Sequence, residues 1–318
     1  MGAPAWEPST SAMSAELQNR EAGTLGTRRI VCQYISEALS ALNGARPSDV
    51  SIHAARKSIK RTRAVWRLLE PALPAAAFRD ANRRLRNAAR PLGAARDARI
   101  LVVALDRLLQ ARGGVASAGG ARGFRRALMR HASAIKHGVM FEPGGLELSR
   151  EELRGAYQRI QARALEKRGW AVIGKGMRRV YARGRRLYRS LPADARADQL
   201  HEWRKQVKSL HHQFAVLRPL AVGPIGKLAS QAGKLSERLG DDHDLAVLRT
   251  EVLAHRHAFS SAARQAGIIA AIDRRRTYLQ KMAFKLGARI YADKPHALYA
   301  RFGEYWHDWR RAKNQTKT

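Results

Sequence analysis

Cysteine is almost absent from this chain of 318 residues, which contains only Cys32. A single thiol excludes a disulfide within the chain and any zinc site built on several thiolates. Long apolar runs are absent too, so no membrane-spanning helix is expected. The N-terminus lacks the basic segment followed by an apolar one that marks a secretory signal peptide. These absences predict a protein of the reducing cytoplasm.

Carboxylates are scarce relative to cations. The chain carries 60 Lys and Arg against 26 Asp and Glu, which gives a formal net charge of +34 at pH 7. Such an excess destabilises a compact state through self-repulsion, so it indicates a polyanionic partner rather than a requirement of the fold. Hydrophobic residues nevertheless make up 45% of the sequence, a globular proportion that excludes a wholly disordered basic tail.

Helix-forming residues dominate what is present. Ala, Leu and Arg are frequent, and Val and Ile never alternate over a long stretch, so the sequence predicts an all-α fold. Residues 1–23 have few apolar side chains and are predicted to form a flexible leader. Glycine, proline and capping residues divide the remainder into predicted helices at about 27–43, 47–70, 75–90, 95–112, 122–137, 149–167, 170–190, 195–218, 224–239, 242–260, 262–287 and 295–312.

Two short motifs occur twice, in the same order. The motif His-x-x-Arg-Lys-x-x-Lys starts at His53 and again at His201, 148 residues later (201 − 53 = 148). The motif Leu-Gly-x-x-(Arg or His)-Asp starts at Leu92 and again at Leu239, 147 residues later (239 − 92 = 147). This recurrence predicts an internally duplicated helical bundle. Its parts are a first half at 24–112, a linker with extra helices at 113–168, and a second half at 169–312.

Basic side chains recur at helical spacing on one face of each helix that carries the first motif. They adjoin the apolar face of the helix instead of lying opposite it. The alternative is a charged face that is simply exposed to solvent. Such faces normally carry both acidic and basic side chains, whereas the row of basic side chains on the predicted helix 47–70, the basic stripe, contains no carboxylate. Trp66, Trp203 and Phe214 fall on the apolar side, so we expect them to pack in the core rather than stack on bases.

These motifs and their order make the sequence similar to the CHAD family, the conserved histidine α-helical domain, over about residues 24–312. The resemblance implies two four-helix-type halves, related by a pseudo-twofold axis, with a basic central groove or pore lined by both. It also implies non-catalytic binding of inorganic polyphosphate, with or without its divalent counter-ions, at cytoplasmic polyphosphate granules. No cofactor is expected. Some members carry a fused CYTH triphosphatase domain, but this sequence has no Glu-x-Glu-x-Lys motif.

The arginine guanidinium can donate two hydrogen bonds to phosphate oxygens, and the lysine ammonium supplies a positive charge on a flexible side chain. Histidines beside them can also donate hydrogen bonds. Surrounding cations should disfavour protonation of these histidines, and a bound polyanion should favour it. The expected polyphosphate-binding residues are His53, Arg56, Lys57, Lys60, Arg63, Arg67, Arg83, Arg86, Arg90, Arg96, His201, Arg204, Lys205, Lys208, His211, His212, Lys234, Arg238 and His243.

Two aspartates of the second motif, Asp97 and Asp244, are expected just inside helix starts, where they would cap the helix or orient a basic neighbour. The run from Asp241 to Asp244 resembles a metal-ligand cluster because it combines three acids with a histidine. The helix dipole explains acids in a first turn equally well, and the first copy has arginine where the run has His243. We therefore expect no resident metal.

Two other functions stay open. The net charge also fits a basic nucleic-acid-binding helical protein, although no recognised motif supports it, and we expect nucleic acid only as a non-specific competitor. An enzyme acting on phosphoanhydrides would need carboxylates that converge on a metal in the basic cleft. The sequence contains no Walker loop, no Gly-x-Ser-x-Gly and no His-Glu-x-x-His, so it lacks the common catalytic signatures.

The helical wheel generates a first prediction. Reversing Arg56, Lys60, Arg204 and Lys208 to Glu should abolish polyphosphate binding while circular dichroism still reports full helicity, because these side chains are assigned to the ligand and not to the core. Arg61 is placed away from the stripe, and its substitution should change binding little. A loss for Arg61 as large as the loss for Arg56 would show that the face is wrongly assigned.

Overall fold

The computed structural model describes residues 15–19, 21–44, 47–110, 121–141, 144–165, 169–192 and 194–315, without the side chains of 94–98, 135–141 and 313–315. Every regular element within these ranges is helical, and they contain no strand, which confirms the all-α prediction. The α-helices are α1 (Gly23–Ala41), α2 (Asp49–Trp66), α3 (Ala75–Ala89), α4 (Pro91–Gln110), α5 (Arg122–Phe141), α6 (Gly145–Gln161), α7 (Trp170–Ser190), α8 (Ala197–Leu217), α9 (Val222–Ala254), α10 (Ala262–Ile290) and α11 (Pro295–Gln315). Short 3-10 helices follow three of them: η1 (Glu70–Ala72), η3 (Arg218–Leu220) and η4 (Arg256–Ala258).

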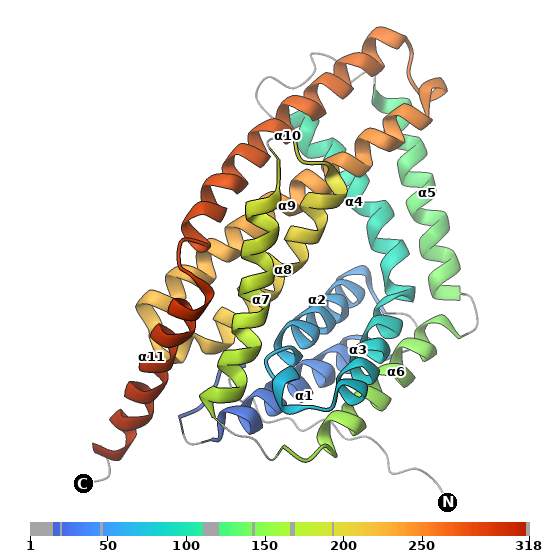
Figure 1. Cartoon of the computed structure of the whole chain (residues 1–318). Helices are drawn as coiled ribbons and strands as arrows, with labels where there is room; N and C mark the ends of the chain where they lie inside the picture. Colours follow the sequence, from blue (N-terminus) through green and yellow to red (C-terminus); the bar gives the residue numbers. More distant parts are fainter. Residues whose placement is uncertain are drawn as a thin grey trace, which may run out of the picture.

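The helices pack in two groups, one of α1, α2, α3 and α6 and the other of α7 to α11, and the groups meet along α2 and α8. α1, α2, α3 and α6 lie together at the lower centre of Figure 1, with α7, α8 and α11 beside them. α4 and α5 extend away from this region and meet α10 and the end of α9 at the top of the picture (Figure 1). Among the described residues, none of the helices combines the length and apolar character that crossing a bilayer requires.

Local chemistry explains where several helices begin. The side chain of Ser48 accepts a hydrogen bond from the backbone N–H of Ser51 at 3.1 Å and so caps α2. Ser261 caps α10 in the same way. Pro91 occupies the first position of α4, where its missing N–H costs nothing, so the proline predicted to end the third helix instead begins the fourth.

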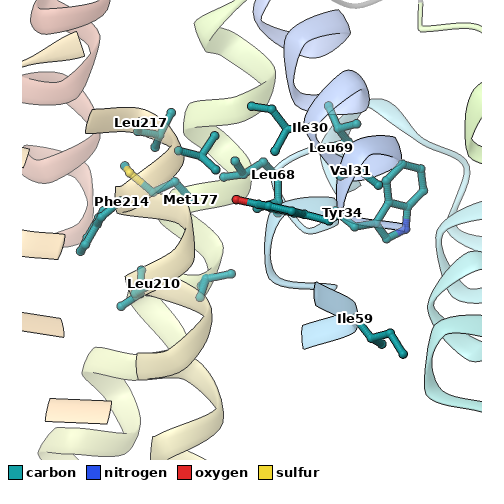
Figure 2. Close-up of a cluster of buried hydrophobic side chains, with 14 of the residues drawn as sticks. Ile30, Val31, Tyr34, Ile59, Leu68, Leu69, Met177, Leu210, Phe214 and Leu217 are labelled. Atoms are coloured by element: carbon teal, nitrogen blue, oxygen red, sulfur yellow. The ribbon is translucent and has the colours of Figure 1, made fainter. Parts of the chain in front are cut away.

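The main core joins α1 and the turn after α2 to α7 and α8. Figure 2 shows the side chains that meet there, which include Ile30, Val31, Tyr34, Leu68, Met177, Leu210, Phe214 and Leu217. Gly176 allows α7 to approach this turn, since a Cβ at that position would lie 2.4 Å from the carbonyl oxygen of Leu68. Trp66, Trp203 and Phe214 are all buried, which confirms their prediction as core residues.

A second, separate core lies at the far end of the molecule, where α4, α5, α9 and α10 meet (Figure 1). Phe124 of α5 stacks on Phe259 at a centroid distance of 5.0 Å, and Leu105, Leu248 and Ile272 are fully buried around them. This core fixes α4 and α5 against the second half of the chain. Of the helices predicted within the linker, α5 contributes Phe124 and Leu128 to this core, and α6 contributes Leu153 and Ile160 to the main core.

The structure also orders part of the segment predicted as a leader. Leu17 is buried, and its N–H donates to the carbonyl oxygen of Val216 on α8. Glu21 forms an ion pair with Arg29 of α1 at 2.6 Å. Residues 1–14 lie outside the described ranges, as does Gly113–Gly120 of the predicted linker.

The clearest correction to the predicted helices concerns α9. The predicted helices 224–239 and 242–260 form one continuous helix from Val222 to Ala254. Gly240 is not a helix end, and the acids that follow it are not in a first turn. Gly240 and Asp242 are both buried in the middle of α9, so tertiary contacts carry the helix through a sequence that has the local marks of a boundary.

Asp242 is held by α10. The exposed fraction of its side chain is 1%, and its Oδ1 accepts hydrogen bonds from Arg276 Nε at 3.1 Å and Gln280 Nε2 at 2.9 Å. A buried carboxylate is tolerated only when it is paired and hydrogen-bonded. This contact ties the centre of α9 to α10.

Replacing Asp242 with Ala should therefore lower the free energy of unfolding by about 3 kcal/mol, because it leaves the Arg276 guanidinium without its buried partner. The matched control is Asp273→Ala, which breaks an exposed ion pair between the same two helices, with Arg249 at 2.9 Å. The control substitution should lower the free energy of unfolding by less than about 1 kcal/mol. Urea unfolding followed by circular dichroism measures both, and equal losses would contradict the assignment.

Candidate basic site between the two helix groups

α2 and α8 meet through polar side chains as well as through the core. The buried Gln213 Nε2 of α8 donates to the carbonyl oxygen of Ala64 on α2 at 2.9 Å. Arg67, just after α2, extends to Gln206 Oε1 at 3.4 Å and Ser209 Oγ at 3.5 Å. The C-terminal part of α2 is therefore fixed against the middle of α8, and this sets the relative positions of the cations on both helices.

A cavity of about 1080 Å³ lies beside this contact, bounded by α2, α4, α5, α8, α9 and α10. His53 of α2 lines it together with Arg204 and Lys208 of α8. Asp244 of α9 lines it too. Residues from both copies of the first motif thus face one cavity, although they are about 150 positions apart in the sequence.

The two motifs of the second half are also in contact. Arg204 belongs to the first motif and Gly240 to the second, and a Cβ built on Gly240 would lie 3.3 Å from Arg204 Nη2. Such a distance is tighter than nearly all real Cβ contacts, so any side chain at position 240 would push the guanidinium. The glycine in the Leu-Gly pair therefore makes room for the arginine of the other motif.

Four arginines from three helices form a second basic group, the arginine cluster. Its members are Arg63, Arg67, Arg86 and Arg183. The pKa of Arg63 is lowered to about 10, first by burial and then by the neighbouring charges of Arg67 and Arg86. Burial also lowers the pKa of Arg67, with Arg183 of α7 as the next cause and Glu70 opposing it. Like charges are thus crowded at the end of α2.

Arg183 is a member that sequence reasoning missed. It comes from α7, whose many arginines gave no reason to prefer one. The close approach of α7 at Gly176 to the turn after α2 brings Arg183 to this place, and no sequence pattern announces that approach.

The adjacent histidines His211 and His212 have different surroundings. His211 Nδ1 lies 2.9 Å from the carbonyl oxygen of Ala229 on α9, so its ring is engaged in helix packing. The pKa of His212 is lowered to about 3, first by burial and then by the charges of His211, Lys208, Arg61 and Lys57. Burial and, after it, cationic neighbours therefore disfavour protonation of His212.

The structure places His201 and His243 apart from the large cavity. Their rings lie 4.4 Å apart, and both line a second pocket, of about 800 Å³, at the ends of α7 and α8. The pKa of His201 falls to about 4, mainly through burial and then through His243. Glu202 and Glu251 also line this pocket, so it lacks the wholly cationic lining expected for a phosphate site.

Other predicted residues are held by carboxylates or by the fold. Arg83 pairs with Asp80, and Lys205 pairs with Glu202 at 2.5 Å. Arg56 is buried, with an exposed fraction of 8%, so an Arg56→Glu reversal would bury a carboxylate and disturb the fold. The four-residue reversal predicted from the sequence is for that reason not a clean test of binding.

The remaining predicted residues are placed as follows. Lys57 and Arg86 are exposed, Lys60 is half-buried, and Arg90 is exposed directly after α3. Lys234 is exposed and Arg238 half-buried on α9, and neither is among the residues that line the large cavity. The side chains of Arg96 and Asp97 lie outside the described residues.

The prediction that Asp97 and Asp244 lie just inside helix starts is wrong. α4 begins at Pro91, which places Asp97 in its second turn, and Asp244 lies within the long helix α9. The same continuity of α9 removes the helix-dipole explanation for the run from Asp241 to Asp244. The carboxylate of Asp242 is instead held by Arg276 and Gln280.

Comparison with known proteins agrees with this arrangement. A family model described as the CHAD domain matches residues 33–253. The chain belongs to the CHAD family. The fold is similar to the crystal structure of the CHAD domain from the plant Ricinus communis, with a TM-score of 0.55 and 17% sequence identity over 91% of this chain and 94% of that chain. No curated protein matches this sequence.

This CHAD domain carries ion pairs in the large cavity that sequence reasoning did not foresee. Arg99 pairs with Asp49 at 2.6 Å, and Arg125 with Asp106 at 2.7 Å. They join α4 to α2 and to α5. Their partners are distant in sequence, so only the packing of the helices brings them together.

His212 generates a prediction about pH. The unfolded imidazole titrates near pH 6.5 and the folded one near 3, so the unfolded state alone takes up a proton as the pH falls through this interval. The stability due to neutral His212 is complete above pH 6.5 and decreases below it. Between pH 7 and pH 5 the free energy of unfolding should fall by about 2 kcal/mol more in the wild type than in His212→Gln.

The control for this measurement is His307→Gln, which changes an exposed histidine of α11. Urea unfolding at the two pH values should give this control the same pH dependence as the wild type. A wild-type pH dependence in His212→Gln would contradict the assignment.

Proposed function

We propose that this CHAD domain binds inorganic polyphosphate without catalysing its cleavage. The single observation that carries the proposal is that His53, Arg204 and Lys208, from the two copies of the first motif, line one cavity. A polyanion placed there would contact both halves of the chain at once. Lys60 and the arginine cluster continue the cationic surface of α2 beyond the cavity.

The crowding of cations favours an anionic ligand. Burial and like charges lower the pKa of both Arg63 and Arg67, so their charged forms are destabilised in the unliganded protein. A phosphate chain would relieve this repulsion and accept charge-assisted hydrogen bonds. Arginine binds phosphate oxygens in pairs, while lysine supplies a mobile point charge, so the two residue types suit a ligand of variable conformation.

In this proposal the two halves form a duplicated bundle, with a pseudo-twofold axis that passes near the contact of α2 with α8. The support is that each half contributes a motif helix, that these helices touch, and that both face the cavity. The groove runs from the cavity along α2 to the arginine cluster. A continuous groove would let one chain of phosphates span both halves.

A purely binding role fits the carboxylates of the cavity. Asp49 and Asp106 are each held by an arginine at less than 3 Å, and Asp241 lies 3.8 Å from Arg107. Cleavage of a phosphoanhydride would require carboxylates directed at a metal or at an attacking water. Three of the five carboxylates that line the cavity are directed at guanidinium groups instead; the other two are Glu237 and Asp244. Polyphosphate binding of this kind would suit a protein that attaches to polyphosphate granules in the cytoplasm or organises them.

Nucleic acid is the alternative polyanion. Trp66, Trp203 and Phe214, the aromatic residues nearest the basic stripes in sequence, are buried in the core and cannot stack on bases. We therefore propose that duplex DNA binds only through diffuse charge attraction, which salt weakens.

Calorimetric titration with long-chain polyphosphate at about 0.15 M salt tests the proposal, because this ionic strength screens attraction between distant exposed charges. The wild type should bind saturably, and duplex DNA should not displace the ligand. The double variant Lys60→Gln, Lys208→Gln should bind at least about tenfold more weakly, since each lysine supplies a charge-assisted hydrogen bond.

The matched control is Lys281→Gln, Lys285→Gln, which removes the same charge from exposed positions on α10. It should bind polyphosphate within about twofold of the wild type, as expected for charges remote from the ligand. Equal losses in the two variants, together with displacement by DNA, would contradict a shaped phosphate receptor and favour the nucleic-acid alternative.

A further inference from the structure

The walls of the large cavity differ in chemistry. α8 contributes only cations, Arg204 and Lys208. α4 and α5 contribute apolar side chains, which include Val102, Val103 and Met129, beside the ion-paired Arg99, Asp106, Arg107 and Arg125. α2 and α9 contact both α8 and α4, and they therefore lie between the cationic wall and the apolar wall. A linear polyphosphate has no apolar part, so it would leave the α4–α5 wall unused.

The apolar wall is open to solvent as it stands. Val103 and Met129 are 40% and 49% exposed, and Val50 of α2, at the same cavity, is 79% exposed. Apolar side chains that share a cavity with convergent charged groups are the usual lining of a small-molecule site. A ligand with an organic group would remove this surface from water.

Polar groups lie beside the apolar side chains of α4 and α5, and they indicate which kind of organic group the ligand would carry. Asp106 is held in place by two hydrogen bonds from Arg125, at 2.7 and 2.9 Å, and Ser133 and Ser236 line the same cavity. A carboxylate held in this way repels phosphate but can accept hydrogen bonds from hydroxyl or amino groups. A ribose or a nucleobase offers such donors, and a hydrocarbon chain does not.

We infer that this cavity binds a nucleoside polyphosphate, with its phosphate chain on Arg204, Lys208 and His53 and its base on Val103 and Met129. The inference rests on the proposed function, since it uses the same cations for the phosphates. The cavity volume of about 1080 Å³ is sufficient for a ligand of this size. The base would cover the apolar wall that inorganic polyphosphate leaves exposed.

Calorimetric titration with ATP and with inorganic tripolyphosphate tests the inference, because the two ligands share a triphosphate and differ in the nucleoside. The wild type should bind ATP about tenfold more tightly than tripolyphosphate, which corresponds to the burial of a few apolar groups. The variant Val103→Thr, Met129→Gln keeps the size of both side chains. It should lose this preference for ATP and bind tripolyphosphate as the wild type does.

The control variant is Leu253→Gln, which changes a side chain of α9 that is 50% exposed and does not line the cavity. It should keep the preference for ATP. Equal wild-type affinity for ATP and tripolyphosphate would overturn the inference, as would a lost preference in Leu253→Gln or tighter binding of geranyl diphosphate than of ATP. Each of these results would leave polyphosphate binding intact. Failure of long-chain polyphosphate itself to bind would instead overturn the proposed function.

Discussion

The packing of α2 against α8 is the contact on which the rest of this structure depends. Both helices carry stripes of cations, so they repel each other electrostatically wherever those stripes converge. Apolar packing of Leu210 and Phe214 with the turn after α2, and the buried hydrogen bond from Gln213 to the carbonyl oxygen of Ala64, hold them together. The cavity depends on this contact, and so does the approach of Arg61 and Lys57 of α2 to His212, which adds to the effect of burial on its pKa. The arginine cluster depends instead on the approach of α7 to the end of α2.

The distribution of carboxylates shows how the fold accommodates its charge. Many ion pairs join helices away from the contact of α2 with α8, such as Arg84 with Glu152 and Arg249 with Asp273. Arg63 and Arg67, at the end of α2, have lowered pKa values, and Glu70 is the acid that opposes the shift of Arg67. The protein therefore relieves repulsion around its edges and concentrates it between its two helix groups. An anionic ligand at that place would gain binding energy from the repulsion it removes.

Several features were predictable from the sequence because they depend on local chemistry. The spacing of apolar residues predicted the burial of Trp66, Trp203 and Phe214, and the helix α7 was predicted with its observed bounds. Prediction failed where distant contacts override local signals. Gly240 followed by acids has the form of a helix boundary, yet α9 continues through it because Arg204 packs on the glycine and α10 binds Asp242. His201 shares the motif of Arg204 but faces another pocket.

The sequence by itself determined the helical class, the apolar and cationic faces, and the family, since these depend on residue periodicity and on short motifs. Only the tertiary structure decided which cations meet. Arg183 lies near Arg63 and Arg67 because Gly176 lets α7 approach the end of α2 closely. Arg83 forms an ion pair with Asp80 on its own helix. A helical wheel gives the direction of a side chain around its own axis. It contains no information on the neighbouring helix, whose position is set by the packing of the core.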